Sequence, residues 1–158
     1  YVEKVNPDWI VSYNYVHLIN KDVIDYMPNK IINMHISLLP WNRGFSPNIW
    51  SFIDDTPKGV TIHRVNCGLD KGEILYQRVC NFDVRQETFS STYMRLNEMI
   101  VQLFKENWEN IKRGNCQGVP QVGEGSYHSK RDLELLQQRI MFSWEDNIEK
   151  FLLKYKNL

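Results

Sequence analysis

Apolar and β-branched residues cluster in short runs along the first half of the chain, and each run predicts a β-strand. Residues 8–19 begin as a continuous apolar run, which suits a strand covered on both faces of a sheet. Residues 30–37 predict a second strand. The runs at 59–65 and 73–82 flank a turn that contains Gly and Asp, so they predict a hairpin with a long loop.

Two segments between these strands carry the start signals of short helices. Residues 20–28 predict a helix with Asn20 as its N-cap. Residues 46–55 predict another, with Ser46 as N-cap and Pro47 at the first position, where the missing N–H costs nothing.

One long amphipathic pattern dominates the second half of the chain. Between residues 88 and 113 the apolar positions recur in steps of three and four, and Gly114 follows, so a long helix is predicted. Residues 117–128 predict a loop or a weak hairpin. Two capping-box patterns predict the starts of two short helices: Ser129 with Asp132, and Ser143 with Asp146.

The alternation of strands and helices predicts an α/β fold with a mixed sheet. The chain has no initiator Met, and its first residues have the pattern of a helix end that leads into a strand. We therefore expect it to be a piece of a longer protein.

Composition narrows the class of protein. A hydrophobic fraction of 42% excludes a disordered tail. Nineteen basic and nineteen acidic residues cancel, and no apolar run approaches the roughly 20 residues that span a bilayer, so we expect small-molecule partners rather than nucleic acid or membrane. Three widely spaced cysteines argue against a disulfide framework and a zinc ribbon, and favour a reduced cytoplasmic setting: Cys67, Cys80 and Cys116.

Two polar side chains share one face of the predicted second strand. Asn33 and His35 are two residues apart, near the carboxyl end of the strand, where ligands bind in open α/β sheets. Asp70 lies between Gly68 and Gly72, which permit an unusual turn close to another backbone. A carboxamide, an imidazole and a carboxylate together suit acyl transfer to an amine, in which an oxyanion is stabilised and a proton moves.

Each of these residues also has an ordinary structural interpretation. A lone strand histidine is more often packed and hydrogen-bonded than catalytic, and a lone Asn or an Asp between glycines is more often a turn residue. The other histidines have no Cys or carboxylate at metal-ligand spacing, so no metal site is predicted: His17, His63 and His128. The residues alone therefore give a candidate site without a reaction.

The order and spacing of several motifs resemble the formyltransferase family that uses 10-formyltetrahydrofolate. The similar stretches are Asn-x-His-x-Ser-Leu-Leu-Pro from residue 33, Arg-Gly from 43, Gly-Val-Thr-Ile-His from 59 and Gly-Leu-Asp-x-Gly from 68. The resemblance covers about residues 7 to 136. It implies a Rossmann-like α/β formyltransferase core with a mixed sheet that lacks the family's N-terminal strands.

The resemblance also implies roles for individual residues. Asn33, His35 and Asp70 match the family's catalytic trio: His35 would move the proton, Asn33 would bind the oxyanion, and Asp70 would orient His35 directly or through a water. The residues that would bind the folate are Tyr15, Val16, His17, Ile19, Asn66, Cys67, Gly68 and Leu69.

The amine acceptor implied by the resemblance is a nucleotide-linked amino-deoxysugar destined for surface polysaccharide, such as lipopolysaccharide O-antigen. Tyr127 and His128 would stack on or cap the nucleotide, although an ordinary surface loop explains them equally well. Arg43 would bind a phosphate or pin its loop through backbone carbonyls, and the second role is favoured.

Other interpretations stay open. A glycinamide ribonucleotide formyltransferase shares the motif that starts at Asn33, and an initiator-tRNA formyltransferase would want a basic surface. A non-catalytic folate-binding remnant and a hydrolase of the formyl-folate are further alternatives. The resemblance divides the chain into the C-terminal part of the catalytic domain, residues 1–115, and a loop or hairpin with short helices, residues 116–158. A homodimer is compatible with the sequence, which does not specify the oligomeric state.

Overall fold

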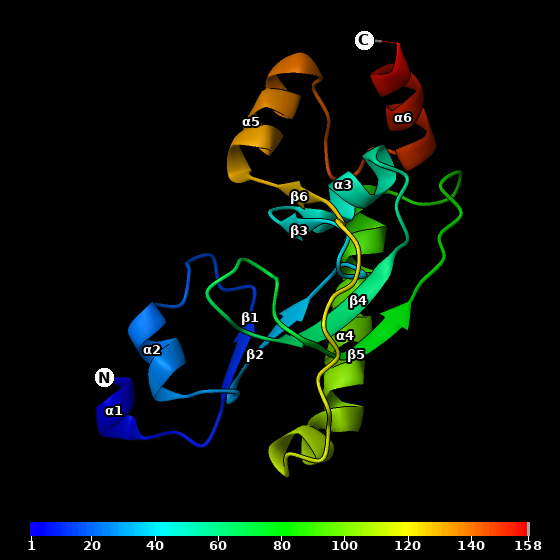
Figure 1. Ribbon diagram of the computed structural model, residues 1–158. Helices are drawn as coiled ribbons and strands as arrows, with labels where there is room; N and C mark the ends of the chain where they lie inside the picture. Colours follow the sequence, from blue (N-terminus) through cyan, green and yellow to red (C-terminus); the bar gives the residue numbers. More distant parts are fainter. Residues whose placement is uncertain (158) are drawn as a thin grey trace.

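A four-stranded sheet forms the centre of the fold, with the longest helix against one face of it (Figure 1). The computed structural model describes residues 1–157. The helices are α1 (Val2–Val5), α2 (Lys21–Tyr26), α3 (Pro47–Ile53), α4 (Phe89–Lys112), α5 (Lys130–Arg139) and α6 (Ile148–Lys156). The strands are β1 (Ile10–Tyr13), β2 (Ile31–His35), β3 (Arg43–Gly44), β4 (Gly59–Arg64), β5 (Ile74–Val79) and β6 (Tyr127–His128).

The sheet has the strand order β1-β2-β4-β5 and mixed polarity. Strand β1 runs parallel to β2, whereas β4 runs antiparallel to both β2 and β5. This arrangement confirms the predicted α/β class with a mixed sheet. It also confirms the hairpin predicted from the two runs at 59–65 and 73–82.

The prediction that the first strand is covered on both faces is wrong. Strand β1 contains four residues and lies at an edge of the sheet, where the side chains of Val11 and Tyr13 are more than a third exposed. The reason is the position of α4, which packs mainly on β4, β2 and β5 and meets β1 at its margin, where the Tyr13 hydroxyl donates a hydrogen bond to Asn97 Oδ1.

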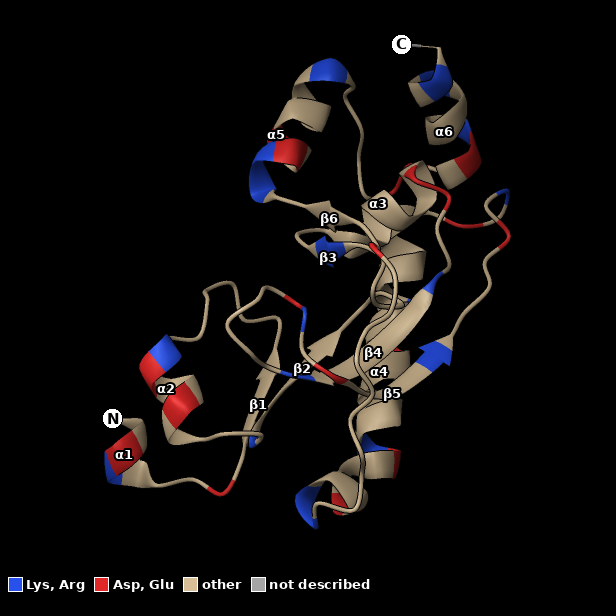
Figure 2. Ribbon diagram, viewed as in Figure 1, with Lys and Arg blue, Asp and Glu red and all other residues tan. Residues whose placement is uncertain are grey.

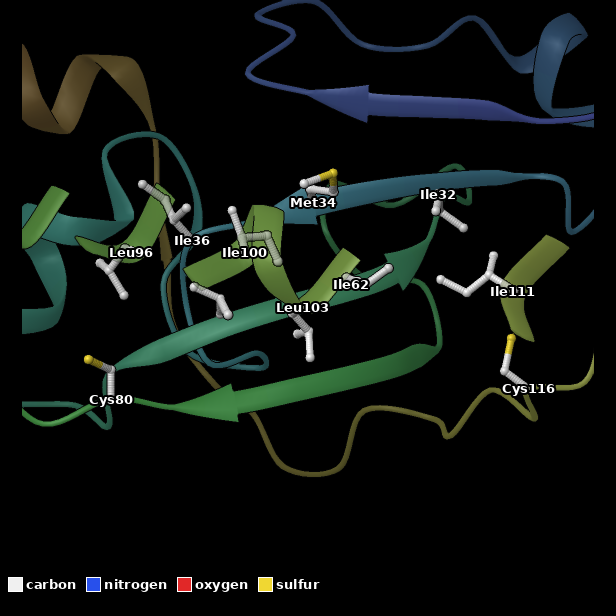
Figure 3. Packing of buried hydrophobic residues seen from close by; sticks show 11 residues of the cluster. Ile32, Met34, Ile36, Ile62, Cys80, Leu96, Ile100, Leu103, Ile111 and Cys116 are labelled. Atoms are coloured by element: carbon white, nitrogen blue, oxygen red, sulfur yellow. The ribbon is translucent and has the colours of Figure 1, made fainter. Parts of the chain in front are cut away.

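The main core lies between the sheet and α4 (Figure 3). Strand β2 contributes Ile32 and Met34, strand β4 contributes Ile62, and α4 contributes Ile100 and Leu103. Because side chains alternate along a strand, burial of these residues against α4 directs their neighbours to the opposite face of the sheet. That opposite face carries the polar side chains of the candidate site.

Most predicted helix starts are confirmed. The side chain of Asn20 accepts a hydrogen bond from the backbone N–H of Asp22 at the start of α2. A capping box of Thr88 and Ser91 opens α4, and another of Ser129 and Asp132 opens α5.

Two predicted helix starts need correction. Ser46 precedes α3 as expected, but its φ of 52° is left-handed and its side chain makes no capping hydrogen bond. Ser143 and Asp146 bond to each other within a turn, and α6 begins later with Asn147 as its N-cap. Asn147 was overlooked because the Ser-x-x-Asp pattern precedes it and has the stronger sequence signature.

The C-terminal segment packs on α3 and on the start of α4 (Figure 1). A second apolar cluster joins these elements, and it contains Trp50, Phe89, Leu136 and Phe151. Within the segment predicted as a loop or weak hairpin, β6 instead pairs in parallel with β3. This short two-stranded sheet holds the C-terminal segment beside the loop that follows β2.

Charged residues of both signs are intermingled along α1, α2 and α5, as Figure 2 shows. Across residues 1–157, no helix is both long enough and apolar enough to cross a bilayer. The three cysteines are unpaired, with Cys67 exposed and Cys80 and Cys116 buried. The division of the chain at residue 115 stays a prediction.

Candidate functional site

The ladder between β2 and β4 builds the floor of the site. Asn33 pairs with His63 across this ladder, and His35 pairs with Thr61. Because Met34 points toward α4, Asn33 and His35 project together from the opposite face, as their spacing predicts.

Asp70 reaches this floor from the loop between β4 and β5. Its backbone is left-handed, with φ of 51°. The loop also requires Gly72, because a Cβ there would lie 1.7 Å from the carbonyl oxygen of Arg64. The carboxylate side chain is only 9% exposed: Oδ1 accepts a hydrogen bond from Asn33 Nδ2 (3.3 Å), and Oδ2 accepts one from the backbone N–H of Gly44 (2.9 Å).

His35 is held in one orientation by the loop that follows its strand. Its Nε2 lies 3.0 Å from the carbonyl oxygen of Asn42. Because a carbonyl only accepts hydrogen bonds, Nε2 carries the proton, and Nδ1 presents a lone pair in the neutral ring. Nδ1 lies 3.8 Å from Asp70 Oδ2, which is too long for a hydrogen bond but close enough for a strong electrostatic interaction.

Burial and charge set the protonation states of this pair. Burial lowers the pKa of the His35 imidazole, although the Asp70 carboxylate opposes that shift. Burial alone would raise the pKa of the Asp70 carboxyl, but the His35 and His63 rings and the N–H of Gly44 hold it well below its usual range. Near neutral pH the site therefore contains a neutral imidazole beside a carboxylate.

Asn42 fixes the loop that positions His35. It is fully buried and left-handed, with φ of 56°. Its backbone N–H donates to Ser126 Oγ, and its side-chain amide donates to Thr56 Oγ1. These bonds hold the Asn42 carbonyl in place for His35 and tie it to the C-terminal segment.

A cavity of about 960 Å³ opens above the floor. Asn33, His35, His63 and Asp70 all line it. All eight residues expected to bind the folate also line it: Tyr15, Val16, His17, Ile19, Asn66, Cys67, Gly68 and Leu69. The fold thus brings the predicted trio and the predicted folate residues to one cavity.

The residues predicted to bind the acceptor differ in whether their side chains already have partners within the protein. Tyr127 lines the cavity and is 54% exposed. His128 also lines it, but its ring stacks on Trp50 with centroids 3.9 Å apart, and its Nε2 lies 2.6 Å from Asp54 Oδ2. Those contacts occupy His128 in joining β6 to α3.

Arg43 lies outside the large cavity. Its guanidinium donates to Gln121 Oε1 through Nε and Nη2, both at 3.1 Å, and to the carbonyl oxygen of Glu124. It lines a separate cavity of about 440 Å³. These contacts join the loop that follows β2 to the loop before β6, and the role of Arg43 toward an acceptor stays a prediction.

Three residues of the site had no assigned role in the sequence analysis: His63, Asn42 and Gly44. His63 shares a strand face with Thr61, and this alternation was visible in the sequence. Its neighbour Asn33, however, follows only from the register of β2 against β4. Asn42 and Gly44 act through backbone groups, which leave little signal in the sequence.

The described part of the chain contains no group of three or more His, Cys, Asp or Glu side chains that could hold a metal ion. The groups of the trio that can take part in chemistry are an imidazole, a carboxamide and a carboxylate.

Comparisons with known proteins agree with this geometry. The protein-family model described as formyl transferase matches residues 1–107. The formyltransferase PseJ from Anoxybacillus kamchatkensis, solved in complex with UDP-4,6-dideoxy-4-formamido-L-AltNAc and tetrahydrofolate, is 43% identical. That alignment has a TM-score of 0.87 and covers 92% of this chain and 76% of PseJ. The likeness confirms the Rossmann-like formyltransferase core implied by the motifs.

Two curated relatives show how much of a longer protein the chain matches. The dTDP-4-amino-4,6-dideoxyglucose formyltransferase of Mycobacterium bovis is 33% identical over 109 residues, which are 69% of this chain and 46% of that protein. The methionyl-tRNA formyltransferase of Finegoldia magna is 45% identical over 75 residues, which are 47% of this chain and 24% of that protein. The chain thus spans half or less of the length of these relatives.

Proposed function

The chain belongs to the formyl transferase family, and from this premise we propose that it transfers a formyl group from 10-formyltetrahydrofolate to the amino group of a nucleotide-linked amino-deoxysugar. The observation that carries the proposal is the shared cavity. The trio suited to acyl transfer and the eight residues expected to bind folate line the same 960 Å³ space.

The choice of acceptor is supported by the relatives. PseJ, at 43% identity over 92% of this chain, was solved with a UDP-linked formamido sugar. Methionyl-tRNA formyltransferases also match, at 45% identity over 47% of this chain and at 34% identity over 76%, both over a smaller share of the chain than PseJ. The net charge of zero gives no overall attraction to tRNA. We assign Tyr127 to the acceptor side of the cavity, and assign His128 and Arg43 to holding the surrounding loops.

In the proposed mechanism, the amine nitrogen attacks the formyl carbon of the folate and forms a tetrahedral intermediate. Asn33 donates an N–H to the oxygen that becomes negatively charged. His35 accepts a proton from the attacking nitrogen at Nδ1, since Nε2–H is held by the Asn42 carbonyl. The carboxylate of Asp70, 3.8 Å away, stabilises the imidazolium that results.

Collapse of the intermediate completes the transfer. The bond between the formyl carbon and N10 of the folate breaks, and His35 returns its proton to N10. The products are the formamido sugar and tetrahydrofolate. We place the reaction in the cytoplasm, in keeping with three unpaired cysteines, and the product in the supply of sugars for surface polysaccharide such as O-antigen.

The direct test incubates the chain with 10-formyltetrahydrofolate and a UDP- or dTDP-linked 4-amino-4,6-dideoxysugar, and detects the formamido sugar by mass spectrometry. The matched control is His35→Gln, whose amide N–H can still donate to Asn42 but which cannot accept a proton. We expect turnover to fall by orders of magnitude while calorimetry shows that 5-formyltetrahydrofolate still binds.

Other outcomes would reject the proposal in favour of a named alternative. Formylation of glycinamide ribonucleotide or methionyl-tRNA, with no reaction on amino sugars, would change the acceptor. Release of formate without any acceptor would indicate a hydrolase. Folate binding without any transfer would indicate a non-catalytic remnant.

A further inference from the structure

His63 on β4 has a buried imidazole ring that takes no part in the mechanism described above. His63 is 2% exposed and lies directly across the β2–β4 ladder from Asn33. Its Nδ1 lies 2.8 Å from the carbonyl oxygen of Arg64. Since that carbonyl can only accept, Nδ1 carries a proton, and Nε2 offers a lone pair whenever the ring holds no second proton.

That lone pair faces the amide of Asn33. Asn33 Nδ2 lies 3.3 Å from His63 Nε2 and 3.3 Å from Asp70 Oδ1, and these two acceptors are 3.4 Å apart. The triangle is nearly equilateral, so the acceptors subtend about 60° at Nδ2, whereas the two N–H bonds of a planar carboxamide diverge by about 120°. Two arrangements fit these distances: each N–H bonds to one acceptor, or one N–H is shared between both acceptors and the second points away from them. Only the shared arrangement leaves an N–H for an oxyanion.

We propose that His63 is a positioning residue that, together with Asp70, aims the second N–H of Asn33 at the developing oxyanion. This inference rests on the proposed function. If Asp70 were the sole acceptor, the carboxamide would turn toward Oδ1 and the second N–H would turn with it. Catalytic groups must be held within about 10–20° of their productive geometry, so this rotation lowers the rate.

The first test does not need an active enzyme. The proposal requires that Nε2 of His63 carry no proton, and nuclear magnetic resonance of the isotope-labelled wild-type chain measures this directly. One of the two Asn33 side-chain protons should exchange with solvent much more slowly than the other. Variants Asn33→Ala and His63→Gln serve only to assign these signals. A proton on Nε2, or equal exchange of the two protons, would overturn the proposal.

The second test is a double-mutant cycle. His63→Leu removes the acceptor and should lower kcat by about 10- to 100-fold, less than the loss of a whole oxyanion donor, with the KM for the folate unchanged. His63→Gln, whose side-chain oxygen can accept at the position of Nε2, should recover most of the lost rate. In an Asn33→Ala background, His63→Leu should have little further effect.

The contrary outcomes separate the two proposals. An equal loss in both backgrounds, or no recovery with Gln, would give His63 a merely structural role and overturn the inference. Complete inactivity of the wild-type chain toward every acceptor would refute the proposed function instead. The resonance measurement would then still decide whether His63 orients Asn33.

Discussion

Asp70→Asn is the substitution that tests the electrostatics of the site most directly. Asn has the same shape and tolerates the left-handed backbone at this position, where φ is 51°. The substitution converts one carboxylate oxygen into a hydrogen-bond donor. Either the N–H of Gly44 or that of Asn33 must then face another donor at a side chain that is only 9% exposed.

The expected magnitude follows from those contacts. Loss of one hydrogen bond to a buried charged group costs about 1.5–3 kcal/mol of unfolding free energy. Because the folded-state pKa of Asp70 is held below its ordinary value, the carboxylate stabilises the fold fully above its unfolded pKa of about 3.9. That stabilisation is lost as the pH falls toward the folded-state value. The difference between wild type and variant should therefore be full at pH 7 and shrink below about pH 4.

Asp55→Asn is the matched control. Asp55 also has a left-handed backbone, with φ of 50°, but its side chain is 99% exposed and faces only Lys58. Urea unfolding of both variants at several pH values measures the effect, and Asp55→Asn should change the unfolding free energy by no more than about 0.5 kcal/mol. Equal destabilisation by the two substitutions, or a pH-independent effect at Asp70, would refute the reasoning.

Three further predictions concern the surroundings of the trio. Gly44→Ala should lower the melting temperature more than Gly123→Ala. Both glycines have φ near 90°, but the new Cβ would lie 2.4 Å from a β6 carbonyl oxygen at Gly44 and would meet no atom within 4 Å at Gly123. Equal melting temperatures would contradict this. The His35 ring should titrate below the ordinary histidine value of about 6.5, since burial lowers its pKa, and a resonance titration with a higher midpoint would show the charged form to be stabilised instead. Arg43→Lys keeps the positive charge but loses the planar guanidinium that bonds Gln121 and Glu124 together, so limited proteolysis within 117–126 should become faster. An unchanged proteolysis rate would show that Arg43 does not hold this loop.

Gly44 shows why the fold around the trio was harder to predict than the trio itself. The sequence placed Asn33 and His35 on one strand face through their spacing, and strand alternation is a local property. The backbone N–H of Gly44 that binds Asp70 has no sequence signature. Its position depends on β3 pairing with β6, which lies more than 80 residues later.

The roles of the two remaining histidines illustrate the same division. His63 was interpreted as an ordinary strand residue and His128 as a candidate for nucleotide stacking. The register of β2 against β4 brings His63 to Asn33, and the packing of β6 on α3 commits His128 to Trp50. Such long-range pairings depend on which surfaces meet, and a local pattern does not contain that information.

The sequence by itself determined the four strands of the main sheet, the long helix, the shared face of Asn33 and His35, and the family, because periodicity and motif spacing are local. Only the tertiary structure decided that Asp70 folds back onto that face, that the folate residues at 15–19 and 66–69 line one cavity, and that β1 lies at an exposed edge. These outcomes depend on chain segments far apart in sequence, which are joined by buried hydrogen bonds and by the cover that α4 provides.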